Sequence, residues 1–335
     1  MAAGVSGEMR PAAVAPRWRL PDGCDRRLTP AREDLADAAL EARIRAERYV
    51  SPRAGRITEP LVDLRPSPDP MARIDTQLPF GEPIEIYDEA DGWIWLRSRI
   101  DGYVGYALAE SAASAGHGPT HRVATRAALV FEAPDIKAAA VRLPWASAVC
   151  VAETVKGAGT NGLLGRLASG GYVPMAQLRP LTDRATDWVA EAEALIGQPY
   201  LWGGRSGDGV DCSSLIQLAL AAAGCAFPRD SDMQAAAELP GISRLDRAER
   251  GVLRRGDLVF WAGHVGVMQD ERRLLHANAH HMAVASEPLS DTTARIAAKE
   301  GKDITSILRL DTEAMLDVLP LDPPLAVPGK AEQTS

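Results

Sequence analysis

The residue type best suited to chemistry in this sequence is a cysteine, Cys212. It follows a glycine-rich run that begins at Gly203, and it directly precedes an apolar stretch, Ser213–Ala223, with the composition of a buried helix. A thiol at a helix start faces unpaired backbone N–H groups and the positive end of the helix dipole, and both favour the thiolate. We therefore predict a nucleophilic cysteine. The alternative is an inert, buried cysteine near a helix start.

A thiolate nucleophile needs a base and proton donor, and histidine usually supplies both. His264 lies in a glycine-flanked apolar strand, and His276 lies in the next predicted strand. If residues 269–271 form the turn, the hairpin places His264 directly opposite His276, and His276 would orient His264 by a hydrogen bond. Two alternatives stay open: structural histidines, and a Cys-His-His zinc site, for which no fourth ligand has suitable spacing.

Helices followed by strands must position these three residues. One helix is predicted over Asp187–Ile196 with Gly197 at its end, and a second over Ser213–Ala223 with Gly224 at its end. Helix first and antiparallel strands afterwards is the order of an α+β domain. The strands that follow are predicted at Asp257–Trp261, His264–Gln269, Leu274–Ala277 and Ile304–Leu310.

The upstream half of the chain is rich in short strands. Turn signals at Asp91-Gly92 and Asp101-Gly102 separate β-branched and aromatic runs and indicate a small barrel. After a linker rich in Ala, Gly and Ser, a second strand-rich block echoes the first, because Gly102-Tyr103-Val104 recurs as Gly171-Tyr172-Val173. The sequence therefore predicts a duplicated barrel.

A helix is also predicted near the N-terminus, over Ala31–Arg48. Thr29 would cap it, Pro30 suits the first helical position, and Leu35 with several alanines supplies a modest apolar stripe. Its other face is charged, so we expect it to pack across another part of the protein.

Five short motifs follow one another in the C-terminal half. They are Tyr200-Leu201-Trp202-Gly203-Gly204, Asp211-Cys212-Ser213-Ser214-Leu215, Pro228-Arg229-Asp230-Ser231, Gly256-Asp257-Leu258-Val259-Phe260 and Gly263-His264-Val265-Gly266. Together they resemble the NlpC-type cell-wall cysteine peptidases, which have a papain-like fold. The resemblance spans about Thr182–Leu310, and it departs at Ser214, where the family usually carries glycine. The two upstream blocks resemble bacterial SH3-like barrels, and the whole arrangement is similar to the dipeptidyl-peptidase VI branch.

This resemblance implies a hydrolase of freed murein peptides that cuts between γ-D-glutamate and the diamino acid in L-Ala-γ-D-Glu-(diaminopimelate or Lys). It makes Cys212 the nucleophile, His264 the base and His276 the polar orienter. The branch recognises a free N-terminal L-alanine. No cofactor or metal is implied.

A charged subsite for that amine is expected beside the nucleophile. Asp211 could pair with an ammonium, and Ser213 and Ser231 could hydrogen-bond the peptide. Helix capping by Asp211 and Ser213, and a loop turn at Ser231, are the alternatives.

Four further residues are expected at the pocket by resemblance or composition. By resemblance, Tyr103 matches a first-barrel tyrosine that closes the pocket in relatives. The alternatives are that Tyr103 is a core or surface residue of the barrel, or that Tyr106 is the matching tyrosine instead. Asp75 stands where relatives carry an acidic residue for the amine. Trp202 and Tyr200 would wall the cleft, unless they belong to the core.

The sequence thus predicts an α+β protein with a papain-like peptidase domain after two small SH3-like barrels and an N-terminal helical arm. The predicted divisions are 1–56 (arm and helix), 57–115 (first barrel), 116–181 (second barrel), 182–312 (peptidase domain) and 313–335 (Pro-rich tail).

The composition of the 335-residue chain limits the classes of partner that it is expected to bind. With 37 Lys+Arg against 45 Asp+Glu the formal net charge is −8, which argues against nucleic acid or an anionic membrane as the main partner. The first residues lack the basic start and apolar centre of a signal peptide, so a cytoplasmic protein is expected. Oligomeric state is not indicated. Two rival functions remain: an exported hydrolase of intact wall, and a wall-binding protein with an inert peptidase domain.

Overall fold

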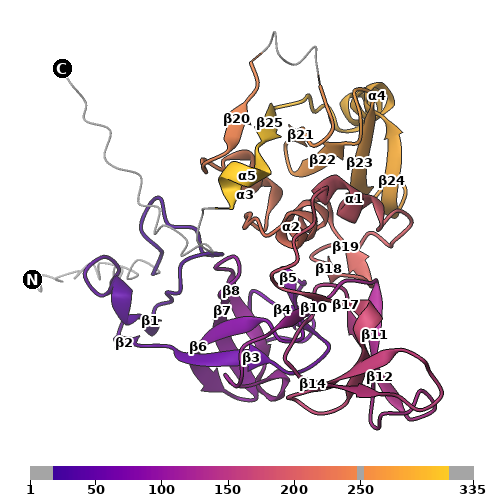
Figure 1. Ribbon diagram of the computed structural model, residues 1–335. Helices are drawn as coiled ribbons and strands as arrows, with labels where there is room; N and C mark the ends of the chain where they lie inside the picture. Colours follow the sequence, from indigo (N-terminus) through magenta and orange to yellow (C-terminus); the bar gives the residue numbers. More distant parts are fainter. Residues whose placement is uncertain (1–17, 247–252, 317–335) are drawn as a thin grey trace, which may run out of the picture.

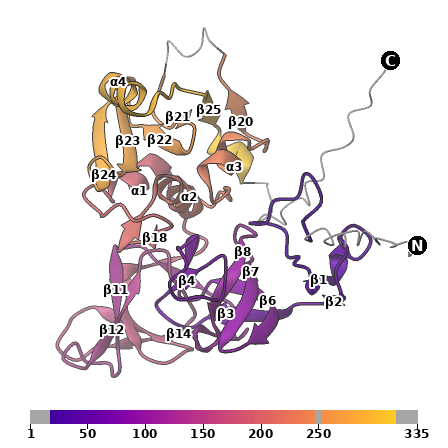
Figure 2. The same cartoon turned by 180° about the vertical axis from the view of Figure 1, so that it is seen from behind.

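The computed structural model describes residues 18–246 and 253–316, which form three successive sections of the chain. Two strand-rich sections, indigo to magenta in Figure 1, lie side by side, and the C-terminal section, orange and yellow, covers one end of both. Figure 2 shows the same arrangement from behind. Residues 1–17 of the predicted arm, and the predicted tail beyond residue 316, fall outside the described residues. Among the described helices, none has the length and apolar content needed to cross a membrane.

The first section is built on a five-stranded antiparallel sheet, β8-β7-β6-β3-β9, beside the two-stranded sheet β4-β5. Apolar side chains from both sheets, such as Leu64, Ile84 and Leu96, pack into one core. The predicted turn at Asp91-Gly92 is confirmed, because both residues have the positive φ (51° and 78°) that a two-residue hairpin turn requires. The strands are β3 (Arg53–Ile57), β4 (Leu61–Leu64), β5 (Thr76–Pro79), β6 (Pro83–Ala90), β7 (Trp93–Ser98), β8 (Val104–Leu108) and β9 (Ala112–Ser114).

The second section repeats this plan. It holds a five-stranded sheet, β12-β11-β16-β15-β14, and a three-stranded sheet, β13-β10-β17. Its strands are β10 (His121–Val123), β11 (Ala127–Phe131), β12 (Ala140–Pro144), β13 (Ala148–Val149), β14 (Val151–Lys156), β15 (Leu163–Leu167), β16 (Tyr172–Pro174) and β17 (Leu178–Pro180).

The sequence echo between the two sections corresponds to a structural one. Gly102 and Gly171 both have positive φ (79° and 83°), and each is followed by a strand and then a 3₁₀ turn, η2 (Ala109–Ser111) or η3 (Met175–Gln177). The repeated Gly-Tyr-Val therefore marks the same local structure in both sections.

The prediction of a helix over Ala31–Arg48 is wrong. The segment forms two short parallel strands and one 3₁₀ turn instead. Leu35 is fully buried against Tyr87 and Trp95 of the first section. Tertiary burial of this leucine outweighs the weak helical preference of an alanine stripe. The elements are β1 (Leu35–Asp37), η1 (Ala38–Leu40) and β2 (Arg48–Val50).

The C-terminal section is a six-stranded antiparallel sheet, β20-β25-β21-β22-β23-β24, with helices on both faces. The two predicted helices and four predicted strands are present, with ends within three residues of those expected; β24 and α4 were not predicted. The helices are α1 (Trp188–Glu193), α2 (Cys212–Ala222), α3 (Ser231–Ala235), α4 (Leu289–Glu300) and α5 (Thr312–Met315). The strands are β18 (Arg205–Ser206) and β19 (Gly209–Val210), which form a separate pair, and β20 (Ile242–Arg244), β21 (Leu258–Trp261), β22 (His264–Met268), β23 (Arg273–Asn278), β24 (Ala283–Pro288) and β25 (Ser306–Leu310).

Alternation along β21 explains why the sheet is covered twice. Leu258 and Phe260 join the core under α1 and α2, while Val259 and Trp261 join a second core with Ile296 of α4. Successive side chains of a strand point to opposite faces, so an uninterrupted apolar strand needs a cover on each side. This sandwich holds α2 against the middle of the sheet.

Buried polar pairs join the first section to the C-terminal section. Arg205 Nη1 lies 2.5 Å from Glu82 Oε2, and neither side chain is more than 4% exposed. The Gln217 amide donates to Asp101 at 3.0 Å, and Arg229 Nε donates to the Thr76 hydroxyl at 2.6 Å. Because buried charges and amides need these partners, the pairs determine how the two sections meet.

Candidate active site

Cys212 is the first residue of α2, and the residue before it explains why the helix begins there. Asp211 has extended backbone, and its carboxylate accepts the Ser214 N–H at 2.8 Å while the Ser214 hydroxyl accepts the Asp211 N–H at 3.0 Å. This is a complete capping box. The capping role proposed for Asp211 is therefore confirmed, and Ser214 contributes to the cap through its hydroxyl.

The Asp211 carboxylate also neutralises a buried arginine that the sequence reasoning did not select. Arg229 is 0% exposed and donates to both carboxylate oxygens, at 3.0 and 2.7 Å. Ser213 donates to the same carboxylate at 3.2 Å, and Gly203 N–H does so at 3.1 Å. Asp211 thus already has a counter-ion, so its main contribution is to hold the helix start, with Ser213, beneath the pocket.

The thiol of Cys212 is buried, with the residue 8% exposed. Burial, and then the neighbouring Asp211 carboxylate, raise the pKa of this thiol to about 12, against smaller opposing effects from the Val265 and Ser213 backbone N–H groups. These two effects oppose the thiolate that the helix start was expected to favour. In the structure without substrate, desolvation and a like charge favour the thiol.

The two predicted histidines contact each other, as expected, and continue into a longer chain of groups. His264 Nε2 lies 2.8 Å from His276 Nδ1, and His276 Nε2 lies 2.7 Å from Glu287 Oε1. Glu287 is itself held by two hydrogen bonds from Arg295, at 2.6 and 2.7 Å.

The register of the hairpin between β22 and β23 differs from the predicted one. Val267 pairs with Leu275, two residues from the pairing that would set His264 opposite His276. A shift of two keeps both rings on one face.

Glu287 determines which nitrogens carry protons. Burial raises the pKa of this carboxyl, but hydrogen bonds from Arg295 and His276 and the charge of Arg295 lower it by more, to about 2, so it is an acceptor. His276 must then donate from Nε2, which leaves its Nδ1 as the acceptor for His264 Nε2–H. His264 Nδ1 consequently carries a free lone pair. Burial lowers the pKa of both rings, to about 3 for His264 and about 4 for His276, so both are neutral.

The nucleophile and the base are brought to one place by the packing of α2 on β22. Cys212 and Val265, the residue after His264, belong to the same core cluster. Within the described residues no hydrogen bond joins the Cys212 thiol to His264. A catalytic pair in a substrate-free site often tightens only when substrate is bound.

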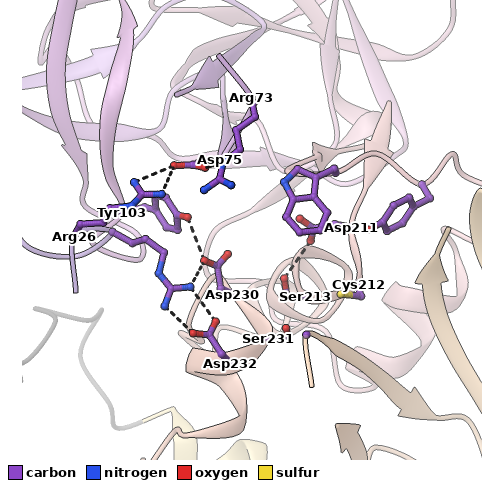
Figure 3. Close-up of a pocket in the computed structure, with 14 residues that line it drawn as sticks. Arg26, Arg73, Asp75, Tyr103, Asp211, Cys212, Ser213, Asp230, Ser231 and Asp232 are labelled. Carbon is purple, nitrogen blue, oxygen red and sulfur yellow. Dashed lines mark hydrogen bonds and ion pairs between the residues drawn. The ribbon is translucent and has the colours of Figure 1, made fainter. Parts of the chain in front are cut away.

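Cys212 opens into a pocket of about 260 Å³ that lies between the sections (Figure 3). Its lining includes every substrate-binding residue that the sequence predicted. These are Asp75, Tyr103, Tyr200, Trp202, Asp211, Ser213 and Ser231. Trp202 is 64% exposed and so is a rim residue, not a core residue.

Tyr103 closes the pocket from the first section. Its hydroxyl donates to Asp230 Oδ2 at 3.1 Å, next to Ser231 at the start of α3. The alternative, Tyr106, is wrong: that ring packs against Trp95 and receives a hydrogen bond from Arg32, at a different hollow.

Residues of the N-terminal arm complete the pocket, and sequence reasoning missed them. Arg27 pairs with Asp230 at 2.7 Å and with Asp232 at 2.7 Å. Arg26, labelled in Figure 3, pairs with Asp75 at 3.4 Å. No local signal separates Arg26 and Arg27 from other basic residues of an irregular arm. Glu287 and Arg295 were missed because the elements that carry them, β24 and α4, were not predicted.

The zinc alternative for Cys212 finds no support in the donor set. Among the described residues, the one close group of potential metal ligands is His276, His281 and Glu287, without Cys212. Both Glu287 oxygens accept from Arg295, whose positive charge disfavours a cation beside them.

Comparison with known proteins agrees with this geometry. Residues 197–297 match the model of the NlpC/P60 family, and residues 64–111 match the model of the bacterial dipeptidyl-peptidase Sh3 domain. The chain therefore carries an NlpC/P60 domain, of the cysteine-peptidase kind, after a bacterial dipeptidyl-peptidase SH3 domain.

Particular relatives extend the similarity beyond single domains. Dipeptidyl-peptidase 6 of Lysinibacillus sphaericus is 26% identical over 236 residues, which is 65% of this chain and 85% of that protein. The γ-D-glutamyl-L-lysine dipeptidyl-peptidase of Bacillus subtilis is 31% identical over 132 residues, 36% of this chain and 40% of the relative. An NlpC/P60 family protein from Bacillus cereus shares the fold, with a TM-score of 0.62 at 17% identity over 76% of this chain and 98% of that one.

Proposed function

We propose that this protein hydrolyses the bond between γ-D-glutamate and the diamino acid in freed murein peptides that carry a free N-terminal L-alanine. The observation that carries the proposal is one pocket that joins the Cys212 thiol to a wall with Asp230 and Asp232, two carboxylates that share one guanidinium, Arg27. An ammonium group would be favoured at that wall, and a peptide anchored there would present a carbonyl to the thiol. The cytoplasmic location expected from the sequence, and a role in wall-peptide recycling, are part of the proposal.

The reaction is acyl transfer in two steps. The Cys212 sulfur attacks the γ-glutamyl carbonyl while His264 Nδ1 takes the thiol proton, and the same nitrogen then protonates the leaving amine. A water molecule, deprotonated by His264, hydrolyses the thioester. The oxyanion would be held by the Cys212 backbone N–H at the helix start and by the Tyr200 hydroxyl.

The proposal is tested with L-Ala-γ-D-Glu-meso-diaminopimelate and its N-acetylated form, with product masses as the readout. We expect release of L-Ala-γ-D-Glu from the free peptide and little or none from the acetylated one. Equal cleavage of both would remove the amine from recognition, and activity on intact sacculi instead would favour the exported wall hydrolase.

Two variants test the proposed roles of Cys212 and Tyr103. Cys212→Ala should abolish hydrolysis and retain peptide binding, because the pocket walls stay in place. Tyr103→Ala should impair cleavage of short free-amine peptides, since Tyr103 positions Asp230. Retained turnover in the first variant, or an unchanged rate in the second, would contradict the assignments.

A further inference from the structure

The charges of the pocket do not balance evenly along its wall. Three arginines line it: Arg26, Arg27 and Arg73. Arg27 is fully committed, because its guanidinium pairs with Asp25, Asp230 and Asp232 at 2.6 to 2.7 Å. The excess of positive charge must therefore lie at the other two arginines, Arg26 and Arg73.

Arg26 and Arg73 converge on a single carboxylate. Arg26 approaches Asp75 Oδ2 at 3.4 Å, and Arg73 Nε donates to Asp75 Oδ1 at 3.0 Å. The Asp75 side chain is 6% exposed, whereas those of Arg26 and Arg73 are 49% and 63% exposed. Two guanidinium groups thus face one buried carboxylate, which leaves one positive charge in excess at this part of the wall, whereas the single guanidinium of Arg27 faces three carboxylates.

These two arginines are brought together by the fold. Arg26 belongs to the arm, which is attached to the first section by the Val104 N–H, 2.7 Å from the Arg27 carbonyl. Arg73 belongs to the segment between β4 and β5. In Figure 3 both lie beside Asp75, across the pocket from Cys212.

A ligand that matches this wall carries an ammonium and a carboxylate close together. The ammonium fits the Asp230 and Asp232 carboxylates, which share the Arg27 guanidinium, and the carboxylate fits a planar guanidinium with unused N–H donors. The proposed substrate has this pattern, since its D-glutamyl residue is linked through the γ-carbonyl and keeps a free α-carboxylate next to the alanyl residue.

We propose that Arg26 and Arg73 bind the free α-carboxylate of the D-glutamyl residue, and that they make the enzyme selective for it over the α-carboxamide form of the same peptide. This inference rests on the proposed function. It concerns which γ-linked peptides are cleaved. A carboxamide has no negative charge for the guanidinium groups, and its NH₂ would face their N–H donors.

The test compares two tripeptides, L-Ala-γ-D-Glu-meso-diaminopimelate and the analogue whose glutamyl α-carboxylate is a carboxamide. The readout is the ratio of their kcat/KM values. For the unmodified protein we expect the carboxylate form to be favoured at least tenfold, because charge-assisted hydrogen bonds to a partly desolvated ligand discriminate at that level. Arg26→Met and Arg73→Met should each lower the ratio several-fold, and the double variant should bring it close to one.

Using the ratio of the two kcat/KM values cancels a side effect of these substitutions on amine binding. Loss of either arginine leaves Asp75 less compensated, which changes amine binding equally for both peptides. Arg166→Met is the matched control, because Arg166 also forms an exposed ion pair, with Glu153, but lies in the second section outside the pocket. It should keep the ratio of the unmodified protein.

The outcomes separate the two proposals. If neither tripeptide is cleaved, the proposed function fails. If both are cleaved equally by the unmodified protein, or if the double variant keeps the original ratio, the role of Arg26 and Arg73 is overturned while the proposed function stands.

Discussion

At the scale of single residues, the protonation state of the nucleophile is decided by burial. With the pKa of Cys212 raised to about 12 and that of His264 lowered to about 3, the resting pair is a neutral thiol and a neutral imidazole. In the proposed reaction the histidine would therefore act as a general base during the attack, as in a serine hydrolase, and not as part of a preformed ion pair.

This state predicts how alkylation depends on pH. The rate constant for reaction of Cys212 with iodoacetamide should rise about tenfold per pH unit from pH 6 to 9, because the thiolate fraction of such a thiol grows in that proportion. Fragment mass spectrometry that assigns the label within the peptide containing Cys212 separates it from Cys24, Cys150 and Cys225. A rate that is flat over this range would mean a preformed thiolate–imidazolium pair.

Glu287 is predicted to act as a positioning residue. Glu287→Gln removes the anion that fixes the His276 tautomer, so kcat/KM should fall about 10- to 100-fold, mainly in kcat, because the base is no longer held in its productive orientation. Glu300→Gln, which removes an exposed carboxylate of α4 paired with Lys302, is the control and should leave activity unchanged. Full activity of Glu287→Gln at every pH would contradict the role.

At the scale of elements, the start of α2 combines a cap with a buried ion pair. Asp211→Ala leaves Arg229 fully buried without its counter-ion, so the free energy of unfolding should fall by about 3–5 kcal/mol. Ser214→Ala removes one side of the capping box and should cost about 1 kcal/mol. Urea unfolding measures both. Equal, small losses would show that Arg229 finds another partner.

Elements with strong local signals were predictable from the sequence, and those with weak signals were not. The helix after Asp211 has a cap, an apolar run and a terminal glycine, and the hairpin at Asp91 has its turn residues. The alanine-rich segment around Leu35 had only a weak stripe, and contact with Tyr87 and Trp95 determined its structure.

At the scale of the whole molecule, the pocket depends on how the first section sits on the C-terminal section. Arg205→Met leaves the Glu82 carboxylate buried without a cation, since Asp101 and Ser98 supply none. We expect a loss of about 3–5 kcal/mol in unfolding free energy and a raised KM, because Tyr103 and Asp75 reach the pocket from the first section.

A double variant tests the origin of that loss. Arg205→Met with Glu82→Gln removes both charges, and it should recover part of the stability that Arg205→Met loses. If the two substitutions are simply additive, the buried pair does not hold the sections together.

By itself the sequence predicted the class of chemistry, the nucleophile, the two histidines and the strand-rich plan, because each is carried by its own local motif, such as the helix start at Cys212 or the hairpin that holds both histidines. Only the tertiary structure decided that burial raises the pKa of the Cys212 thiol, that Glu287 and Arg295 hold His276, and that Arg26 meets Asp75, 49 positions away in the chain. Desolvation and charge pairing depend on what the fold brings together, and residues so far apart carry no local pattern that would reveal it.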